Sequence, residues 1–109
     1  MAITVNIFYK GKNGSAISFA KEMIEKGVVQ RIREEKGNLM YNYFTSFDDK
    51  ETILLIDKWE NQEALDFHHH SKMMEEIAAL RDRYDLTMEV YRYIDDNSAP
   101  SSDSKYIRK

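Results

Sequence analysis

The first ten residues show an alternation that is typical of a β-strand, with apolar side chains at every second position. Ile3, Val5 and Ile7 fall on one face of this strand, and Asn6 and Phe8 fall on the other. Three further segments carry strand-like runs of aromatic, aliphatic and β-branched residues bounded by turn residues. The four predicted strands span residues 3–10, 38–45, 53–59 and 86–93.

Between the first two strands, apolar residues recur at intervals of three and four, which predicts an amphipathic helix. We expect Ser15 to cap its beginning and Gly37 to follow its end. Gly27 falls in the middle and weakens the helix by about 1 kcal/mol relative to alanine. The apolar positions of this helix are Ile17, Phe19, Ala20, Met23, Ile24, Val28 and Ile32.

A second helix is predicted after the third strand, with Asn61 as its N-terminal cap. Ala64, Leu65 and His68 share one face of this helix. The apolar positions that begin at Met73 do not continue the same stripe when each residue advances by about 100°. We therefore expect a bend or a break at residues 70–72.

The order of elements is βαββαβ, which predicts a ferredoxin-like α+β fold with two helices on one face of a four-stranded antiparallel sheet. Because both alternating sets of strand residues are apolar or aromatic, the second face should not stay in water. We expect a homodimer that packs sheet against sheet. Residues 1–94 form the predicted domain, and the polar residues 95–109, which include the only proline, form a predicted flexible tail.

Composition excludes several classes of chemistry. The 109 residues include no cysteine, so disulfides, iron–sulfur clusters and cysteine nucleophiles are excluded. A net charge of −3 with interspersed signs indicates no nucleic-acid partner. No apolar run approaches the roughly 20 residues of a membrane span. The N-terminus enters strand-like sequence directly without a signal-peptide pattern, so we expect a cytoplasmic protein that does not bind membranes.

Trp59 and His68 are the main candidates for a functional site. Trp59, the only tryptophan, ends the third strand, and His68 lies two turns into the helix that follows. If this helix folds back over the sheet, both rings border one cavity that could hold a small planar ligand. The structural alternatives stay open, because a tryptophan is commonly a core anchor and a histidine on an apolar face is commonly a hydrogen-bonded core residue.

The consecutive histidines do not predict a metal site. Neighbouring residues on a helix point about 100° apart, so His68, His69 and His70 cannot close on one ion. The glycine-containing segment 11–15 lacks the spacing of a phosphate-binding loop and is interpreted as a turn. We therefore predict no metal and no cofactor.

Three features together resemble the antibiotic biosynthesis monooxygenase (ABM) family of small dimeric α/β barrels. They are the order of elements, the segment 35–41 that leads into the second strand, and the pattern that runs from Asp57 and Trp59 through 63–65 to His68 and Ser71. The resemblance covers residues 1–94. The chain departs from the family pattern in having Asp57 where glutamate is usual and Lys72 where a proline often follows the serine.

The resemblance implies a monooxygenase that needs no cofactor and acts with dioxygen on a small aromatic or quinol-like compound in a pocket between sheet and helices. A deprotonated, electron-rich substrate can itself give an electron to dioxygen, so the protein needs a dry pocket, a proton acceptor and hydrogen-bond donors. We expect His68 to be the acceptor. The expected substrate contacts are Trp59, Asn6, Tyr41, Phe8 and Leu65.

Two alternatives remain open. A non-catalytic dimer could use the same cavity to bind a hydrophobic metabolite. The fold also includes haem-degrading monooxygenases, and Asn6 matches the strand-one asparagine of that branch. The position of its iron-binding histidine, however, falls near Ala78, which cannot ligate iron, so we rank haem degradation below the cofactor-free hypothesis.

Overall fold

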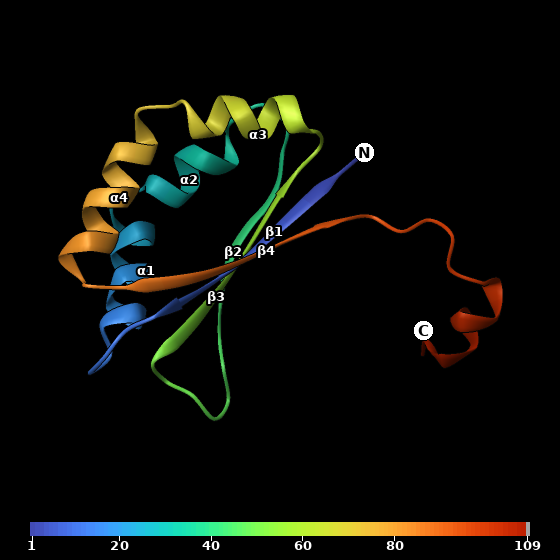
Figure 1. Cartoon of the computed structure of the whole chain (residues 1–109), viewed down its shortest axis with the longest axis horizontal. Helices are drawn as coiled ribbons and strands as arrows, with labels where there is room; N and C mark the ends of the chain where they lie inside the picture. The colour runs from blue at the N-terminus through green and yellow to red at the C-terminus, as the bar shows by residue number, and fades with distance from the viewer. Residues whose placement is uncertain (109) are drawn as a thin grey trace.

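The computed structural model describes residues 1–108 of the chain, and its strands and helices follow the predicted βαββαβ order. The elements are β1 (Ile3–Lys10), α1 (Ser15–Glu25), α2 (Val28–Arg33), β2 (Asn38–Thr45), β3 (Thr52–Trp59), α3 (Gln62–His69), α4 (Met73–Arg83), β4 (Thr87–Ile94) and the 3-10 helix η1 (Ser101–Tyr106). The strands form one antiparallel sheet in the order β2-β3-β1-β4, with the four α-helices on one face (Figure 1). The predicted ferredoxin-like fold is confirmed. Within residues 1–108, no helix combines the length and the apolar character that crossing a membrane requires.

The first predicted helix is divided into α1 and α2 at Gly27, so the prediction of one weakened helix was wrong there. Gly27 has a φ angle of 75°. This left-handed conformation ends a helix and is readily adopted only by glycine. The predicted cap was also wrong, because Gly14 occupies the cap position and Ser15 is the first helical residue. The Ser15 hydroxyl instead accepts a hydrogen bond from the backbone N–H of Lys12 at 3.0 Å.

The predicted interruption of the second helix is confirmed by the separate helices α3 and α4. Asn61 caps α3 as predicted, because its Oδ1 accepts a hydrogen bond from the backbone N–H of Ala64 at 2.8 Å. At the other end, the Ser71 hydroxyl donates to the carbonyl of His68 at 2.8 Å. Both ends of α3 are therefore fixed, and this helix carries the candidate histidine.

The core lies between the helices and one face of the sheet. Alternate residues of β3 from Ile53 to Trp59 turn toward the helices and are buried, as the period of two requires. The largest fully buried side chains include Trp59, Tyr41, Phe19, Met23, Ile32, Ile53, Leu55, Leu65 and Val28. The site residues that lie among them are thus held by the main packing of the fold.

Strand β4 is only partly covered by the helix layer. Val90 and Ile94 lie opposite Ile7 and Ile3 of β1, so their side chains turn toward the helix side of the sheet. Val90 is nevertheless 54% exposed and Ile94 is 57% exposed. Beyond β4 the chain leaves the sheet as an extended segment and reaches η1 on the side away from the helices (Figure 1).

Candidate functional site

The candidate site begins at the end of β3, where Asp57 and Trp59 both turn toward the helices. Trp59 is completely buried and Asp57 is 4% exposed. The indole Nε1–H of Trp59 donates a hydrogen bond to Oδ1 of Asp57 at 2.6 Å. Because residues two apart on a strand share one face, this contact is local and fixes the orientation of the indole ring.

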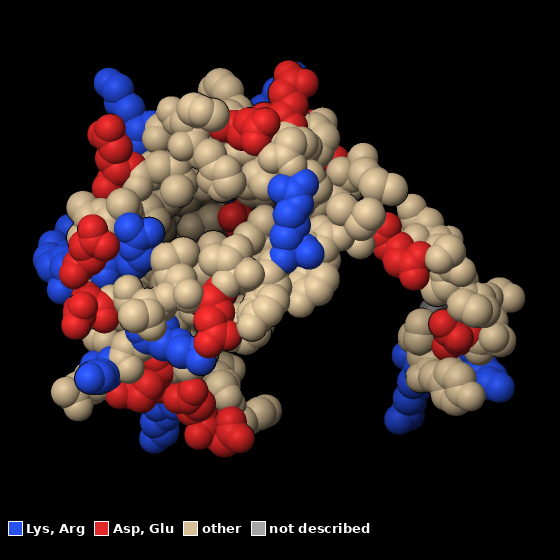
Figure 2. Space-filling view, in the orientation of Figure 1, with Lys and Arg blue, Asp and Glu red and all other residues tan. Residues whose placement is uncertain are grey.

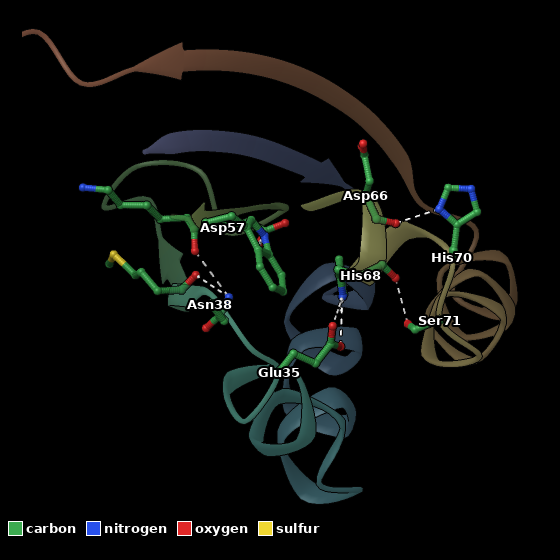
Figure 3. A network of polar contacts seen from close by, with 10 residues as sticks. Glu35, Asn38, Asp57, Asp66, His68, His70 and Ser71 are labelled. Atoms are coloured by element: carbon green, nitrogen blue, oxygen red, sulfur yellow. Dashed lines mark hydrogen bonds and ion pairs between the residues drawn. The ribbon is translucent and has the colours of Figure 1, made fainter. Parts of the chain in front are cut away.

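The turn between α2 and β2 brings Glu35 onto α3. Gly37 in this turn has a φ angle of 85°, and a Cβ built on it would lie only 2.6 Å from the Cβ of Ala64. The turn can therefore pack directly against the first turn of α3 because position 37 has no side chain. His68 lies one helical turn beyond Ala64 on the same face, and Glu35 reaches its ring (Figure 3).

Glu35 and His68 form a buried acid–base pair. Nδ1 of His68 lies 3.1 Å from Oε1 and 3.2 Å from Oε2 of Glu35. The side chains of His68 and Glu35 are only 3% and 9% exposed. Because an ionised carboxylate can only accept hydrogen bonds, it holds the proton of the imidazole on Nδ1. In the neutral ring, Nε2 is then the nitrogen with a free lone pair.

The imidazole of His68 stacks on the indole of Trp59, with ring centroids 4.8 Å apart and planes inclined by 27°. Tyr41 approaches the same imidazole edge-on, at 6.4 Å between centroids and 67° between planes. Leu65 is also buried, at 2% exposure, on the inner face of α3. The structure thus brings four of the predicted site residues to one region of the core.

Asn6 and Phe8, in contrast, lie on the other face of the sheet. Their neighbours Val5 and Tyr9 are buried under the helices, so the alternation along β1 turns Asn6 and Phe8 away from them. A pocket between the helices and the sheet therefore does not include these two side chains. Oδ1 of Asn6 is buried without a hydrogen-bond partner among residues 1–108.

Burial raises the pKa of the Asp57 carboxyl group from 3.8 to about 6, because the ionised form is poorly solvated in the core. The nearby His68 and the hydrogen bond from Trp59 lower the pKa, whereas the charge of Glu35 raises it further. Burial also raises the pKa of the neighbouring phenols of Tyr9, Tyr41 and Tyr43. The tyrosines therefore stay protonated at neutral pH, whereas Asp57 changes its charge near pH 6.

A hollow opens between the helix layer and the sheet, and acidic atoms are visible at its floor (Figure 2). Arg92 of β4 donates a hydrogen bond to Gln62 at the start of α3. The cavities described for residues 1–108 lie elsewhere, and none of the three is lined by Trp59 or His68. One of them, of about 240 Å³, lies beside the turn at Lys36 and the start of α3. The two rings are thus packed against each other rather than separated by open space.

Glu35 was not among the predicted site residues. It lies 33 positions from His68, and no local pattern connects the two. The sequence carries a clearer signal for Asp57. It occupies a position of β3 that the alternation predicts to be buried, and a carboxylate at a buried position is uncommon unless it has a specific role.

The remaining sequence candidates have local explanations. The loop before α1 is closed by Glu51, whose carboxylate accepts hydrogen bonds from the backbone N–H groups of Asn13 and Gly14, the latter at 2.8 Å. This carboxylate takes the place that an anion would occupy at a helix N-terminus. Nδ1 of His70 lies 2.7 Å from the carbonyl oxygen of Asp66, outside the buried cluster (Figure 3). In residues 1–108, no three histidine or acidic side chains are grouped in a way that could hold a metal ion.

Comparison with known proteins confirms the resemblance suggested by the sequence. The family model described as antibiotic biosynthesis monooxygenase matches residues 2–80. YcnE of Bacillus subtilis (strain 168), named as a candidate monooxygenase, is 28% identical over 69 residues, which are 63% of this chain and 70% of YcnE. The matched segment 2–80 contains Glu35, Asp57, Trp59 and His68.

Solved structures share the fold. A candidate antibiotic biosynthesis monooxygenase from Deinococcus radiodurans has a TM-score of 0.75 at 16% identity and covers 92% of this chain and 97% of its own. SnoaB, a cofactor-independent oxygenase from Streptomyces nogalater, has a TM-score of 0.73 at 11% identity and covers 92% of this chain and 98% of its own. At these identities, the similarity concerns the arrangement of elements.

Proposed function

The chain belongs to the antibiotic biosynthesis monooxygenase family, and on this basis we propose that it is a cofactor-independent monooxygenase of a small aromatic or quinol-like compound. The observation that carries the proposal is the buried contact between Nδ1 of His68 and Glu35, at 3.1 Å. A carboxylate that holds the proton on Nδ1 leaves Nε2 as a general base. His68 is therefore the proposed proton acceptor, and Trp59 is the wall against which its ring is fixed.

The proposed chemistry uses a substrate with an acidic CH₂ group beside a carbonyl, as in an anthrone. His68 removes one C–H proton and leaves an enolate, which gives one electron to dioxygen. The carbon radical and superoxide join through a C–O bond, and the proton returns to the outer oxygen to form a hydroperoxide. Loss of the second C–H proton breaks the O–O bond, so that R₂CH₂ and O₂ become R₂C=O and H₂O. Buried phenols such as Tyr41 can donate hydrogen bonds to the enolate oxygen as its charge develops.

The substrate would approach from the side of β4. There, the apolar side chains of Val90 and Ile94 turn toward the helices but are 54% and 57% exposed. An aromatic substrate that covers them would exclude water and strengthen the electrostatic effect of the buried cluster. Because His68 itself is 2% exposed, contact with the substrate also requires a local displacement of the side chains that cover the ring.

Oxygen consumption tests this function. Purified protein free of metal and cofactor is mixed with a panel of anthrones and quinols, and the rate is followed with an oxygen electrode. We expect the wild type to consume oxygen and His68→Gln to lose on the order of 100-fold or more in kcat/KM, as removal of a general base does. His70→Gln is the matched control and should keep the wild-type rate. Equal rates for wild type and His68→Gln would exclude His68 as the base.

The second candidate function is a non-catalytic dimer that binds a hydrophobic metabolite. The deep burial of His68 favours it, because a stacked and fully paired imidazole can have a purely structural role. Tight binding of an aromatic ligand, measured by quenching of Trp59 fluorescence, without oxygen consumption across the panel would support this function over the first.

We also propose that two copies pair through the sheet face that the helices leave open. Phe44, Tyr91 and Tyr93 turn toward this face and are 40%, 45% and 52% exposed. Burial of such aromatic side chains is a common source of dimer stability. We expect sedimentation to give a dimer for the wild type and a monomer for Phe44→Glu. Phe67→Glu, which changes an exposed phenylalanine on α3, is the control and should stay dimeric.

A further inference from the structure

Asp57 is a buried carboxyl group that the proposed reaction does not use. It is 4% exposed on the helix side of β3, and its hydrogen-bond donor is the indole N–H of Trp59 at 2.6 Å. Among the ion pairs of residues 1–108, none involves Asp57. A buried carboxylate that forms no ion pair is costly to the folded state, so its place beside the candidate site calls for a physical explanation.

The surroundings of Asp57 connect it to the acid–base pair. Trp59 links the two, because its ring accepts the stack of His68 on one face while its N–H is held by Asp57. Glu35 from the turn before β2 raises the pKa of Asp57, and His68 from α3 lowers it. The charge of Asp57 in turn raises the pKa of Tyr9 from β1 and of Tyr41 and Tyr43 from β2, while Arg81 of α4 lowers the pKa of Tyr9.

We propose that Asp57 is a positioning residue whose ionised carboxylate holds the indole of Trp59 in its stack with His68, so that proton uptake by Asp57 loosens the stack. The hydrogen bond from an N–H group to an ionised carboxylate is about twice as strong as that to a neutral acceptor. Protonation therefore weakens the contact that orients the indole. It also removes a negative charge close to the imidazole, which changes the electrostatic environment of the base at the same time.

Burial brings the protonation of Asp57 into mildly acidic solution. Burial raises the pKa of Asp57 to about 6, so the carboxylate is ionised at neutral pH and protonated in mildly acidic solution. The stack of Trp59 and His68 should therefore be tighter above this pH and looser below it. This part of the inference concerns the structure alone, and only its effect on turnover rests on the proposed function.

Trp59 is the only tryptophan, so its fluorescence reports this cluster without interference from other indoles. We expect the emission of the wild-type protein to change between pH 5 and 7 with a midpoint near 6. Asp57→Asn retains an amide oxygen that can accept the indole hydrogen bond but does not titrate, so its emission should stay constant over this range. A wild type without the transition, or an Asp57→Asn variant with an unchanged midpoint, would overturn the inference.

The imidazole of His68 is the other titratable group in contact with the indole. The variant His68→Gln therefore shows which of the two groups causes the fluorescence transition, and it does so even if Asp57→Asn does not fold. In this variant the imidazole can no longer titrate, whereas Asp57 is intact. His68 lowers the pKa of Asp57, so its replacement by glutamine should move the midpoint to higher pH. Loss of the transition in His68→Gln would assign it to the histidine and contradict the role of Asp57.

The pH profile of oxygen consumption then connects the stack to turnover. We expect kcat/KM of the wild type to fall below pH 6 and the acidic limb to change shape in Asp57→Asn. An acidic limb identical in both proteins would refute the positioning role in catalysis. A protein without oxygenase activity would refute the proposed function, while the fluorescence titration would still decide whether Asp57 holds the indole.

Discussion

Replacing Asp57 by asparagine should stabilise the protein at neutral pH, although it removes a charged hydrogen-bond acceptor. The pKa of Asp57 rises from 3.8 to about 6 on folding. Each unit corresponds to about 1.4 kcal/mol, so the ionised carboxylate costs the folded state about 3 kcal/mol. The asparagine amide also brings two N–H donors into the buried site, and an unpaired buried donor costs about 1 kcal/mol, which reduces this gain. We therefore expect a net stabilisation of about 2 kcal/mol at pH 8.

The stability difference between Asp57→Asn and the wild type should increase with pH. Because the pKa in the folded state lies above that in the unfolded state, the folded protein holds the proton more tightly. The cost of ionisation is absent below pH 3.8 and complete above pH 6, so it develops between these two values. The advantage of Asp57→Asn should therefore be about 2 kcal/mol at pH 8 and should disappear or reverse near pH 4.

Urea unfolding followed by circular dichroism at pH 4, 6 and 8 measures this difference. Asp82→Asn is the matched control, because it makes the same chemical change at a side chain that is 74% exposed. The difference between Asp57→Asn and the wild type should grow with pH, and that of the control should not. A wild type that is more stable than Asp57→Asn at pH 8 would refute the electrostatic account of this carboxylate.

Three further changes test the packing that positions the site. Gly37→Ala should destabilise the fold by about 1–3 kcal/mol in urea unfolding, because the left-handed backbone and the 2.6 Å approach to Ala64 both exclude a side chain; unchanged stability would show that this approach is not close. Asn61→Ala should cost about 1 kcal/mol in the same assay through the lost cap of α3, and no loss would deny the cap a role. Trp59→Ala should cost about 3–5 kcal/mol, since the indole is completely buried, and a loss below 1 kcal/mol would contradict that burial.

The order and type of the elements could be predicted because hydrophobic periodicity reports burial directly. The alternation in β1 and β3 placed the strands correctly, and the change of stripe after His68 predicted the break between α3 and α4. The break at Gly27 was underestimated. A glycine inside a helical pattern costs little by itself, and the sequence alone does not show that the chain turns there into a left-handed conformation with φ of 75°.

The candidate site was predicted only in part. The proximity of Trp59 and His68 follows from a strand that leads into a helix. The predicted cavity bordered by both rings is not among the three cavities described for residues 1–108, because the rings stack directly on each other at 4.8 Å. Glu35 could not be predicted, because its contact with His68 depends on how the turn at Gly37 packs against α3. The assignment of Asn6 and Phe8 to the same pocket overlooked the alternation of β1, which turns both away from the helices.

The central claim, that His68 is the base of a cofactor-free oxygenation, is tested most directly with isotopically labelled dioxygen and an anthrone. Metal-free wild-type protein should transfer one labelled oxygen atom to the product carbonyl and the other to water. His68→Gln should lose this turnover while keeping its far-ultraviolet circular dichroism and its oligomeric state. Labelled product formed by His68→Gln at the wild-type rate, or none formed by the wild type with any anthrone or quinol, would contradict the account.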